Sequence, residues 1–173
     1  SRDGKSIVYV ALGQTTNYDL WVVSTDPGAK PSVYLQTPFN ERAARFSPDG
    51  RYLAYESDES GRDEVYVQPV PPNGAKWQVS NAGGRQPMWR ADGKEMYFIS
   101  GPKLMAVPVK TDPAGFQAGT AEPLFDGPRP QDFASVYQPS ADGQRFLIRF
   151  AAGDSDSAAP VTVVLNWQSG VKK

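Results

Sequence analysis

Short runs of consecutive apolar residues recur along the chain, each bounded by turn-forming residues. Every run begins three residues after the glycine of an Asp-Gly pair, and the four runs are Ile7–Tyr9, Leu53–Tyr55, Met96–Phe98 and Phe146–Ile148. A half-exposed strand would alternate apolar with polar residues, whereas a continuous apolar run between turns indicates a strand covered on both faces. The pattern predicts four buried strands, one in each of four copies of a repeated unit.

The Asp-Gly pairs give the period of the repeat. They lie 46, 43 and 50 residues apart, at Asp3-Gly4, Asp49-Gly50, Asp92-Gly93 and Asp142-Gly143. A period in this range is typical of a repeat whose unit is a four-stranded sheet. In a tight hairpin the glycine can take a positive φ and the aspartate can bond nearby backbone amides, so these pairs are predicted to be turns.

The remaining strands of each unit are expected around this hairpin. They are innermost strands at 43–47, 86–90 and 133–138, third strands at 19–23, 64–68, 103–107 and 161–165, and outer strands at 32–35, 76–80 and 121–125. These segments favour strands, and no helical period extends over eleven residues. We predict an all-β protein, a β-propeller whose partial ring has about four four-stranded antiparallel blades, at 1–40, 41–84, 85–131 and 132–173.

The first and last blades are expected to be incomplete. Residue 1 lies two positions before the first Asp-Gly turn, which leaves no room for an inner strand, and only six residues follow Trp167. A propeller usually closes by completing one blade with strands from both chain ends. We therefore expect a fragment of a ring of six to eight blades, which either stays open or forms a homodimer that closes an eight-blade ring.

One stretch is specific enough to indicate a family. The segment Arg45–Asp58, which reads RFSPDGRYLAYESD, and the segment Asp63–Val67, which reads DEVYV, resemble the repeat of TolB-like β-propellers, a subgroup of the WD-repeat-like propellers. The third copy departs from that pattern, with Arg90-Ala91 where Ser-Pro is preferred. The resemblance implies a module of a larger bacterial protein, such as the propeller region of a receptor-type serine/threonine kinase. It also implies a periplasmic or extracytoplasmic location and a protein or peptide partner.

Composition and charge argue against several classes of function. Eighteen Lys plus Arg against 19 Asp plus Glu give a net charge of −1. The chain therefore lacks the excess of basic residues that is typical of nucleic-acid-binding proteins. No apolar run approaches the length of a bilayer span. Because the chain has no His and no Cys, it cannot form a Ser-His-Asp or Cys-His catalytic group or a zinc site built on those residues. We expect no nucleic-acid partner, no membrane insertion, no cofactor, no metal and no catalysis by this chain.

Carboxylates are the remaining side chains that could bind a metal ion or support catalysis. Two groups occupy equivalent places after a second strand, namely Asp58, Glu59, Asp63 and Glu64 in the second unit, and Asp154 and Asp156 in the last. Such groups can hold calcium or act as the acid and base of a glycosidase. We expect polar loops instead. A carboxylate-based glycoside hydrolase is the first alternative to a binding module, and a structural spacer domain is the second.

The candidate binding surface is the mouth of the central channel. Loops that enter the innermost strands converge there from every blade. Their polar and aromatic residues are Asn40, Glu41, Arg42, Arg85, Gln86, Gln131, Asp132 and Phe133. We predict a non-catalytic protein- or ligand-binding module that uses this mouth.

Overall fold

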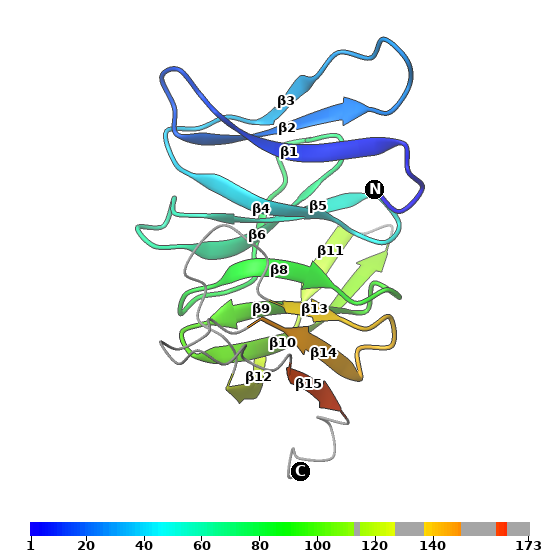
Figure 1. Ribbon diagram of the computed structural model, residues 1–173. Coiled ribbons are helices and arrows are strands. Elements are labelled where there is room, and N and C mark those ends of the chain that lie inside the picture. The colour runs from blue at the N-terminus through cyan, green and yellow to red at the C-terminus, as the bar shows by residue number, and fades with distance from the viewer. Residues whose placement is uncertain (113–114, 127–136, 150–161, 166–173) are drawn as a thin grey trace, which may run out of the picture.

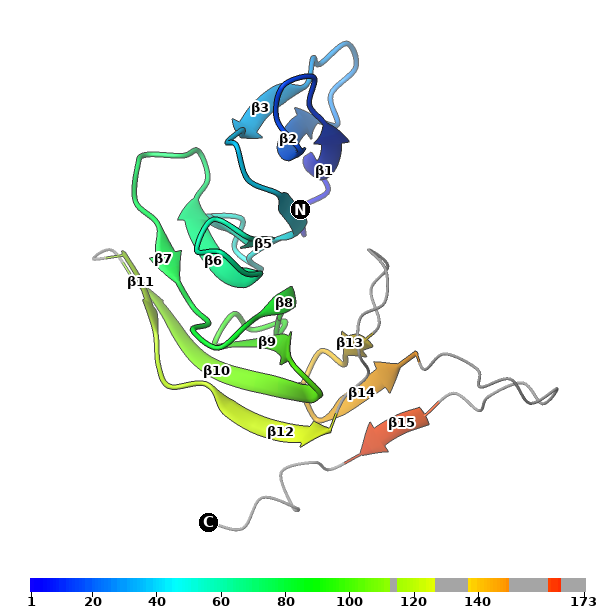
Figure 2. The ribbon, with the colours of Figure 1, turned by 90° about the vertical axis from the view of Figure 1, so that its left-hand side faces the viewer.

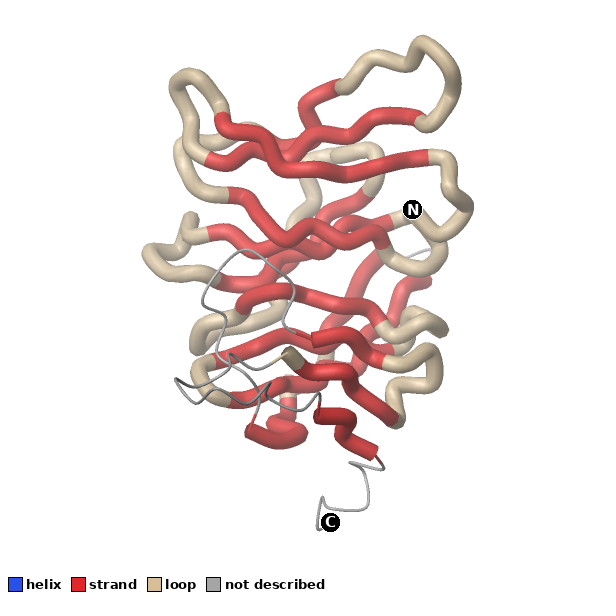
Figure 3. Tube along the Cα trace, viewed as in Figure 1, coloured by secondary structure: helices blue, strands red, loops and turns tan. Residues whose placement is uncertain are grey.

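Four antiparallel sheets follow one another along the chain. The computed structural model describes residues 1–112, 115–126 and 137–149 and the backbone of 162–165. These residues form strands and no helix (Figures 1 and 3). The first sheet contains β1 (Ser6–Leu12), β2 (Tyr18–Ser24) and β3 (Ser32–Leu35), in that order. The second sheet contains β4 (Glu41–Phe46), β5 (Tyr52–Ser57), β6 (Glu64–Pro69) and β7 (Trp77–Gln78).

The third sheet has one strand more than the sequence predicts. It contains β8 (Arg85–Trp89), β9 (Glu95–Ser100), β10 (Lys103–Asp112), β11 (Gly115–Ala118) and β12 (Glu122–Asp126). The beginning of β10 pairs with β12, and its end pairs with β11. The prediction of four strands here is wrong because the third strand does not end at residue 107 but continues to Asp112.

The fourth sheet has three strands, as the sequence predicts. They are β13 (Tyr137–Pro139), β14 (Arg145–Ile148) and β15 (Thr162–Leu165). Figure 2 shows the four sheets fanning out as an arc around a common axis, with the first and fourth sheets at its two ends. This arrangement confirms the expected partial ring, whose first and last blades have three strands each.

Three apolar cores lie between successive sheets, and the central strands contribute to two of them at once. In β5, Leu53 and Tyr55 point into the core shared with the first sheet, whereas Tyr52 and Ala54 belong to the core shared with the third. In β9, Met96 and Phe98 alternate in the same way with Tyr97 and Ile99. Each of these strands is therefore apolar throughout because both of its faces are covered.

The prediction that all four apolar runs are buried is wrong at the ends of the arc. Ile7 is 53% exposed and Leu147 is 51% exposed, and Tyr9 is only half-buried. The first and fourth sheets each pack against a neighbour on one side in the described part of the chain, so one face of β1 and of β14 stays open. Both faces are covered only in the two central sheets.

The Asp-Gly pairs form the predicted hairpin turns. Their glycines have φ between 70° and 73°, and each aspartate accepts a hydrogen bond from the backbone N–H two residues later, as Asp49 does from Arg51 at 3.1 Å. In the second unit the hydroxyl of Ser47 also donates to Asp49, at 2.6 Å. In the third unit Arg90 replaces this serine and donates to both carboxylate oxygens of Asp92, at 2.8 and 2.9 Å. The departure from the repeat therefore preserves the turn.

The additional strand β11 packs the third sheet against the second. Its Phe116 is 3% exposed and lies with its ring centroid 5.8 Å from Tyr52, 5.6 Å from Trp77 and 6.1 Å from Trp89. Aromatic pairs at such distances add to the free energy that burial provides. The extension of β10 therefore serves packing between blades.

Candidate functional site

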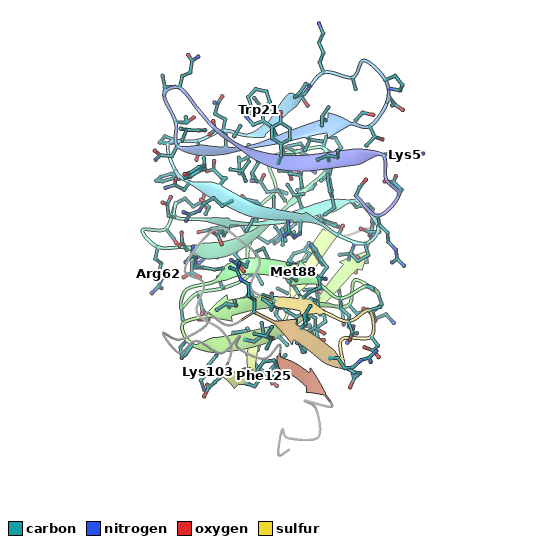
Figure 4. The ribbon with its side chains drawn as sticks, in the orientation of Figure 1. Lys5, Trp21, Arg62, Met88, Lys103 and Phe125 are labelled. Atoms are coloured by element: carbon teal, nitrogen blue, oxygen red, sulfur yellow. The ribbon has the colours of Figure 1, made fainter. Side chains whose placement is uncertain are left out.

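An open pocket of about 420 Å³ lies on the axial side of the first three sheets. Its walls come from β1, β4 and β8, together with Tyr18 and Glu56. Val8, Val10, Leu12 and Met88 supply apolar surface. Figure 4 places Met88 centrally in the molecule, between Lys5, which follows the first Asp-Gly turn, and Arg62 at the opposite edge of the sheets. The pocket therefore lies between the innermost strands β4 and β8 and the edge strand β1 of the first sheet.

A network of two arginines and two carboxylates forms the polar side of this pocket. The Nε of Arg42 lies 3.0 Å from Glu56, and its Nη2 lies 2.5 Å from Asp63. Arg85 approaches the same two acids, with Nη2 3.9 Å from Glu56 and Nε 3.3 Å from Asp63. The network joins the second sheet to the third because Arg85 belongs to β8, whereas Arg42 and Glu56 belong to β4 and β5 and Asp63 lies directly before β6.

Glu56 is the buried centre of the network. It is 1% exposed, and its Oε2 accepts the backbone N–H of Gln86 at 3.0 Å. Burial raises the pKa of Glu56, against the opposing effects of that hydrogen bond and of the guanidinium groups of Arg85 and Arg42. A buried carboxylate needs such partners because desolvation penalises its charged form.

Two equivalent backbone bulges shape the pocket wall. Pairing shifts between Arg42 and Arg45 in the second sheet and between Arg85 and Met88 in the third. Each bulge contains a residue with a positive φ that is not glycine, namely Ala43 (51°) and Gln86 (53°). Such conformations are uncommon outside glycine and concentrate where function constrains the backbone. Both bulges line the pocket, so the two strained residues and the two arginines occur together.

The structure brings together three of the predicted mouth residues, Arg42, Arg85 and Gln86. All three belong to strands β4 and β8, so their placement in loops is corrected. Bulges let these strands begin earlier than the apolar pattern indicates, because a bulge interrupts the alternation from which the start was read.

Two other predicted residues, Asn40 and Glu41, are held by hydrogen bonds away from the pocket. Asn40 donates to Asp58 from its backbone at 2.9 Å and from its side chain at 2.6 Å. Glu41 is fully buried and accepts a hydrogen bond from the hydroxyl of Thr37. Neither residue lines the pocket. Gln131, Asp132 and Phe133 lie outside the described residues, as do Asp154 and Asp156.

The sequence analysis missed Glu56 as a site residue, although a signal was present. Position six after the Asp-Gly glycine is Val10 in the first unit, Ile99 in the third and Arg149 in the fourth, so Glu56 is the one acidic residue at this position. In a strand covered on both faces, a lone carboxylate indicates a buried partner. The structure supplies that partner as two arginines from two neighbouring sheets.

The carboxylates considered for catalysis or calcium are paired within the protein. Asp58 bonds Asn40, Glu59 lies 2.5 Å from the Nζ of Lys76, and Asp63 belongs to the arginine network. Glu64 is fully buried and accepts bonds from Ser80, Arg62 and the backbone of Gly83. Within the described ranges, no group of three or more acidic side chains is arranged to hold a metal ion. The same part of the chain contains no helix long and apolar enough to cross a membrane.

The radiating sheets and their axial pocket define the class of protein as a β-propeller. Solved structures with this fold include the TolB-type protein of Agrobacterium tumefaciens (TM-score 0.57, 21% identity, covering 73% of this chain and 47% of that one) and TolB of Acinetobacter baumannii (TM-score 0.53, 20% identity, 94% and 50%). The periplasmic gluconolactonase of Pseudomonas aeruginosa is also similar (TM-score 0.52, 16% identity, 84% and 47%).

This chain spans about half the length of each of these proteins. No family model and no curated protein matches the sequence. At these identities the likeness concerns the fold, and it confirms the TolB-like propeller that the repeat resembles.

Proposed function

We propose that this chain is a non-catalytic binding module that takes a protein or peptide partner at the axial pocket. The observation that carries the proposal is the convergence of Arg42, Arg85 and the two bulges on an open pocket with apolar walls. Recognition sites commonly combine an apolar surface with a few fixed polar groups. We extend the proposal to a periplasmic or extracytoplasmic location, which the TolB-like fold supports.

The chemistry of the chain favours binding over catalysis. The sequence has no His, the commonest general base, and the two carboxylates closest to the pocket are held by arginines. A propeller fold by itself does not separate these functions, since a gluconolactonase shares it. The proposal therefore rests on the pocket and not on the fold.

The test replaces an exposed residue that lines the pocket and belongs to none of the three apolar cores. Leu12 lines the pocket and is 73% exposed, so Leu12→Asp should leave the fold intact. Leu147→Asp is the matched control, because Leu147 is also an exposed leucine but lies on β14 outside the pocket. Immobilised wild type and the control should capture the same partner from a bacterial envelope extract, and Leu12→Asp should lose it. Equal capture by all three proteins would refute the proposal.

Arg42 is unsuitable for this test. Its side chain is 14% exposed and neutralises Glu56, so Arg42→Ala would leave a buried carboxylate without its nearest partner. Such losses cost about 3–5 kcal/mol. Reduced capture by that variant would report unfolding as readily as lost recognition.

A further inference from the structure

The junction between the second and third sheets shows how this fold holds a carboxylate beside the channel. Glu56 lies six residues after Gly50. Its carboxylate receives the N–H of Gln86 at 3.0 Å and lies 3.9 Å from Arg85. Gln86 takes its positive φ in the β8 bulge, and its N–H there points across to the preceding sheet. The next inner strand therefore supplies one arginine and one backbone donor.

An arginine and a backbone donor recur at the equivalent positions one sheet earlier, where the carboxylate is missing, although the guanidinium of this arginine also contacts Glu56 and Asp63 of its own sheet. Arg42 and Ala43 occupy in β4 the positions that Arg85 and Gln86 occupy in β8, and Ala43 has nearly the same φ as Gln86. In the first sheet the position of Glu56 is taken by Val10, six residues after Gly4. A valine side chain accepts no hydrogen bond. Val10, Arg42 and Ala43 all line the 420 Å³ pocket.

We propose that this junction binds the acidic side chain of an extended peptide segment from a protein partner. The ligand carboxylate takes the place beside Val10 that the Glu56 carboxylate takes one sheet later, where it accepts the N–H of Ala43 and pairs with Arg42. This inference rests on the proposed function and adds the chemistry of the partner.

Charge and shape both favour such a ligand. Three arginines, Arg42, Arg45 and Arg85, line the pocket, whereas the network at its polar side contains two carboxylates, those of Glu56 and Asp63, so one positive charge is in excess. A carboxylate group occupies only a small part of 420 Å³, and the rest of the wall is largely apolar. Apolar side chains that flank the acidic residue can therefore fill the space against Val8, Leu12 and Met88. A free anion would leave that surface open to water.

The variant Val10→Glu tests the site from within. It restores in the first sheet the residue type that the second sheet has, and Val10 is 39% exposed, so the new side chain has room. Its carboxylate should occupy the site and exclude the ligand. Ile7→Glu is the matched control, since it adds the same charge to the same strand at a residue that does not line the pocket.

The probes are the blocked tripeptide acetyl-valyl-glutamyl-valinamide and its glutaminyl counterpart, titrated while the amide N–H signal of Ala43 is followed by NMR. The glutamyl peptide should move this signal downfield and bind at least about tenfold more tightly than the glutaminyl peptide, since hydrogen bonds to charged groups are the stronger ones. Val10→Glu should show the shifted signal without peptide and should lose binding, whereas Ile7→Glu should behave as wild type.

Three results would overturn the inference. They are equal binding of the two peptides, an Ala43 signal in Val10→Glu that matches the unliganded wild type, and tighter binding of sodium gluconate than of the glutamyl peptide, which would assign the site to small sugar acids. The proposed function fails separately. If Leu12→Asp loses the captured partner while Val10→Glu retains it, the pocket binds a protein but the carboxylate site is refuted.

Discussion

The buried carboxyl group of Glu41 should make the folded protein less stable as the pH rises. Glu41 is fully buried between the first two sheets, and its Oε2 has no hydrogen-bond partner. Burial, with a smaller contribution from the charges of Asp19, Glu59 and Asp58, raises the pKa of Glu41 to about 7, against the hydrogen bond from Thr37. An ordinary glutamate ionises near pH 4.5.

The sign and size of the effect follow from proton linkage. Between about pH 4.5 and pH 7 the folded protein keeps a proton that the unfolded chain has lost, so the free energy of unfolding falls as the pH rises. At about 1.36 kcal/mol per pKa unit, the total loss is about 3 kcal/mol above pH 7. Glu41→Gln keeps the size of the side chain but cannot ionise. The variant should therefore be more stable than wild type by about 3 kcal/mol near pH 8.5, and by less than about 1 kcal/mol near pH 5.

Urea unfolding followed by tryptophan fluorescence can measure this difference at about pH 5, 6, 7 and 8.5. Comparison of each variant with wild type cancels the titration of the other carboxylates. Glu122→Gln is the control, because Glu122 is exposed on β12 and should change stability little at any pH. If the stability difference between Glu41→Gln and wild type is the same at every pH, the ionisation of Glu41 is not coupled to folding and the reasoning is refuted.

Two further predictions concern packing between the blades. Phe116→Ala should lower the free energy of unfolding by about 3–5 kcal/mol in urea titrations, because it empties a buried space, whereas Gln117→Ala on the exposed face of β11 should change it by about 0.5 kcal/mol or less. Gly50→Ala should cost about 1–2 kcal/mol from its positive φ alone, since nothing lies near the new methyl group. Gly143→Ala should cost more, because its Cβ would lie 2.3 Å from the hydroxyl of Tyr97, and equal melting temperatures for the two glycine variants would contradict this.

Most of the fold could be predicted from local patterns. The Asp-Gly turn depends on residues within one hairpin, since Gly50 takes its positive φ and Asp49 bonds the backbone two residues later. The strand β11 forms a local hairpin with the end of β10, from Asp112↔Gly115 to Val109↔Ala118. Its packing role could not be predicted locally, because Phe116 contacts Tyr52 and Trp77 in a different blade.

The candidate site also contains residues that the sequence predicts and residues that only the packing of blades explains. Channel geometry places Arg42 and Arg85 near one another, and a repeat of known period predicts this from the sequence. Their partner Glu56 lies on the second strand of its blade and meets Arg85 only because the next blade packs against it. Asn40 and Glu41, which share the same stretch of sequence, turn instead toward Asp58 and Thr37.

The sequence by itself determined the repeat, its turns and the apolar runs of the central strands, because each depends on residues close together in the chain. Only the tertiary structure decided which of these runs are covered on both faces and where a buried carboxylate finds its arginines. Those outcomes depend on the position of a blade in the arc and on contacts between different strands and blades, such as that of Glu56 with Gln86. Local propensity does not encode such contacts, since they form only when one sheet packs on the next.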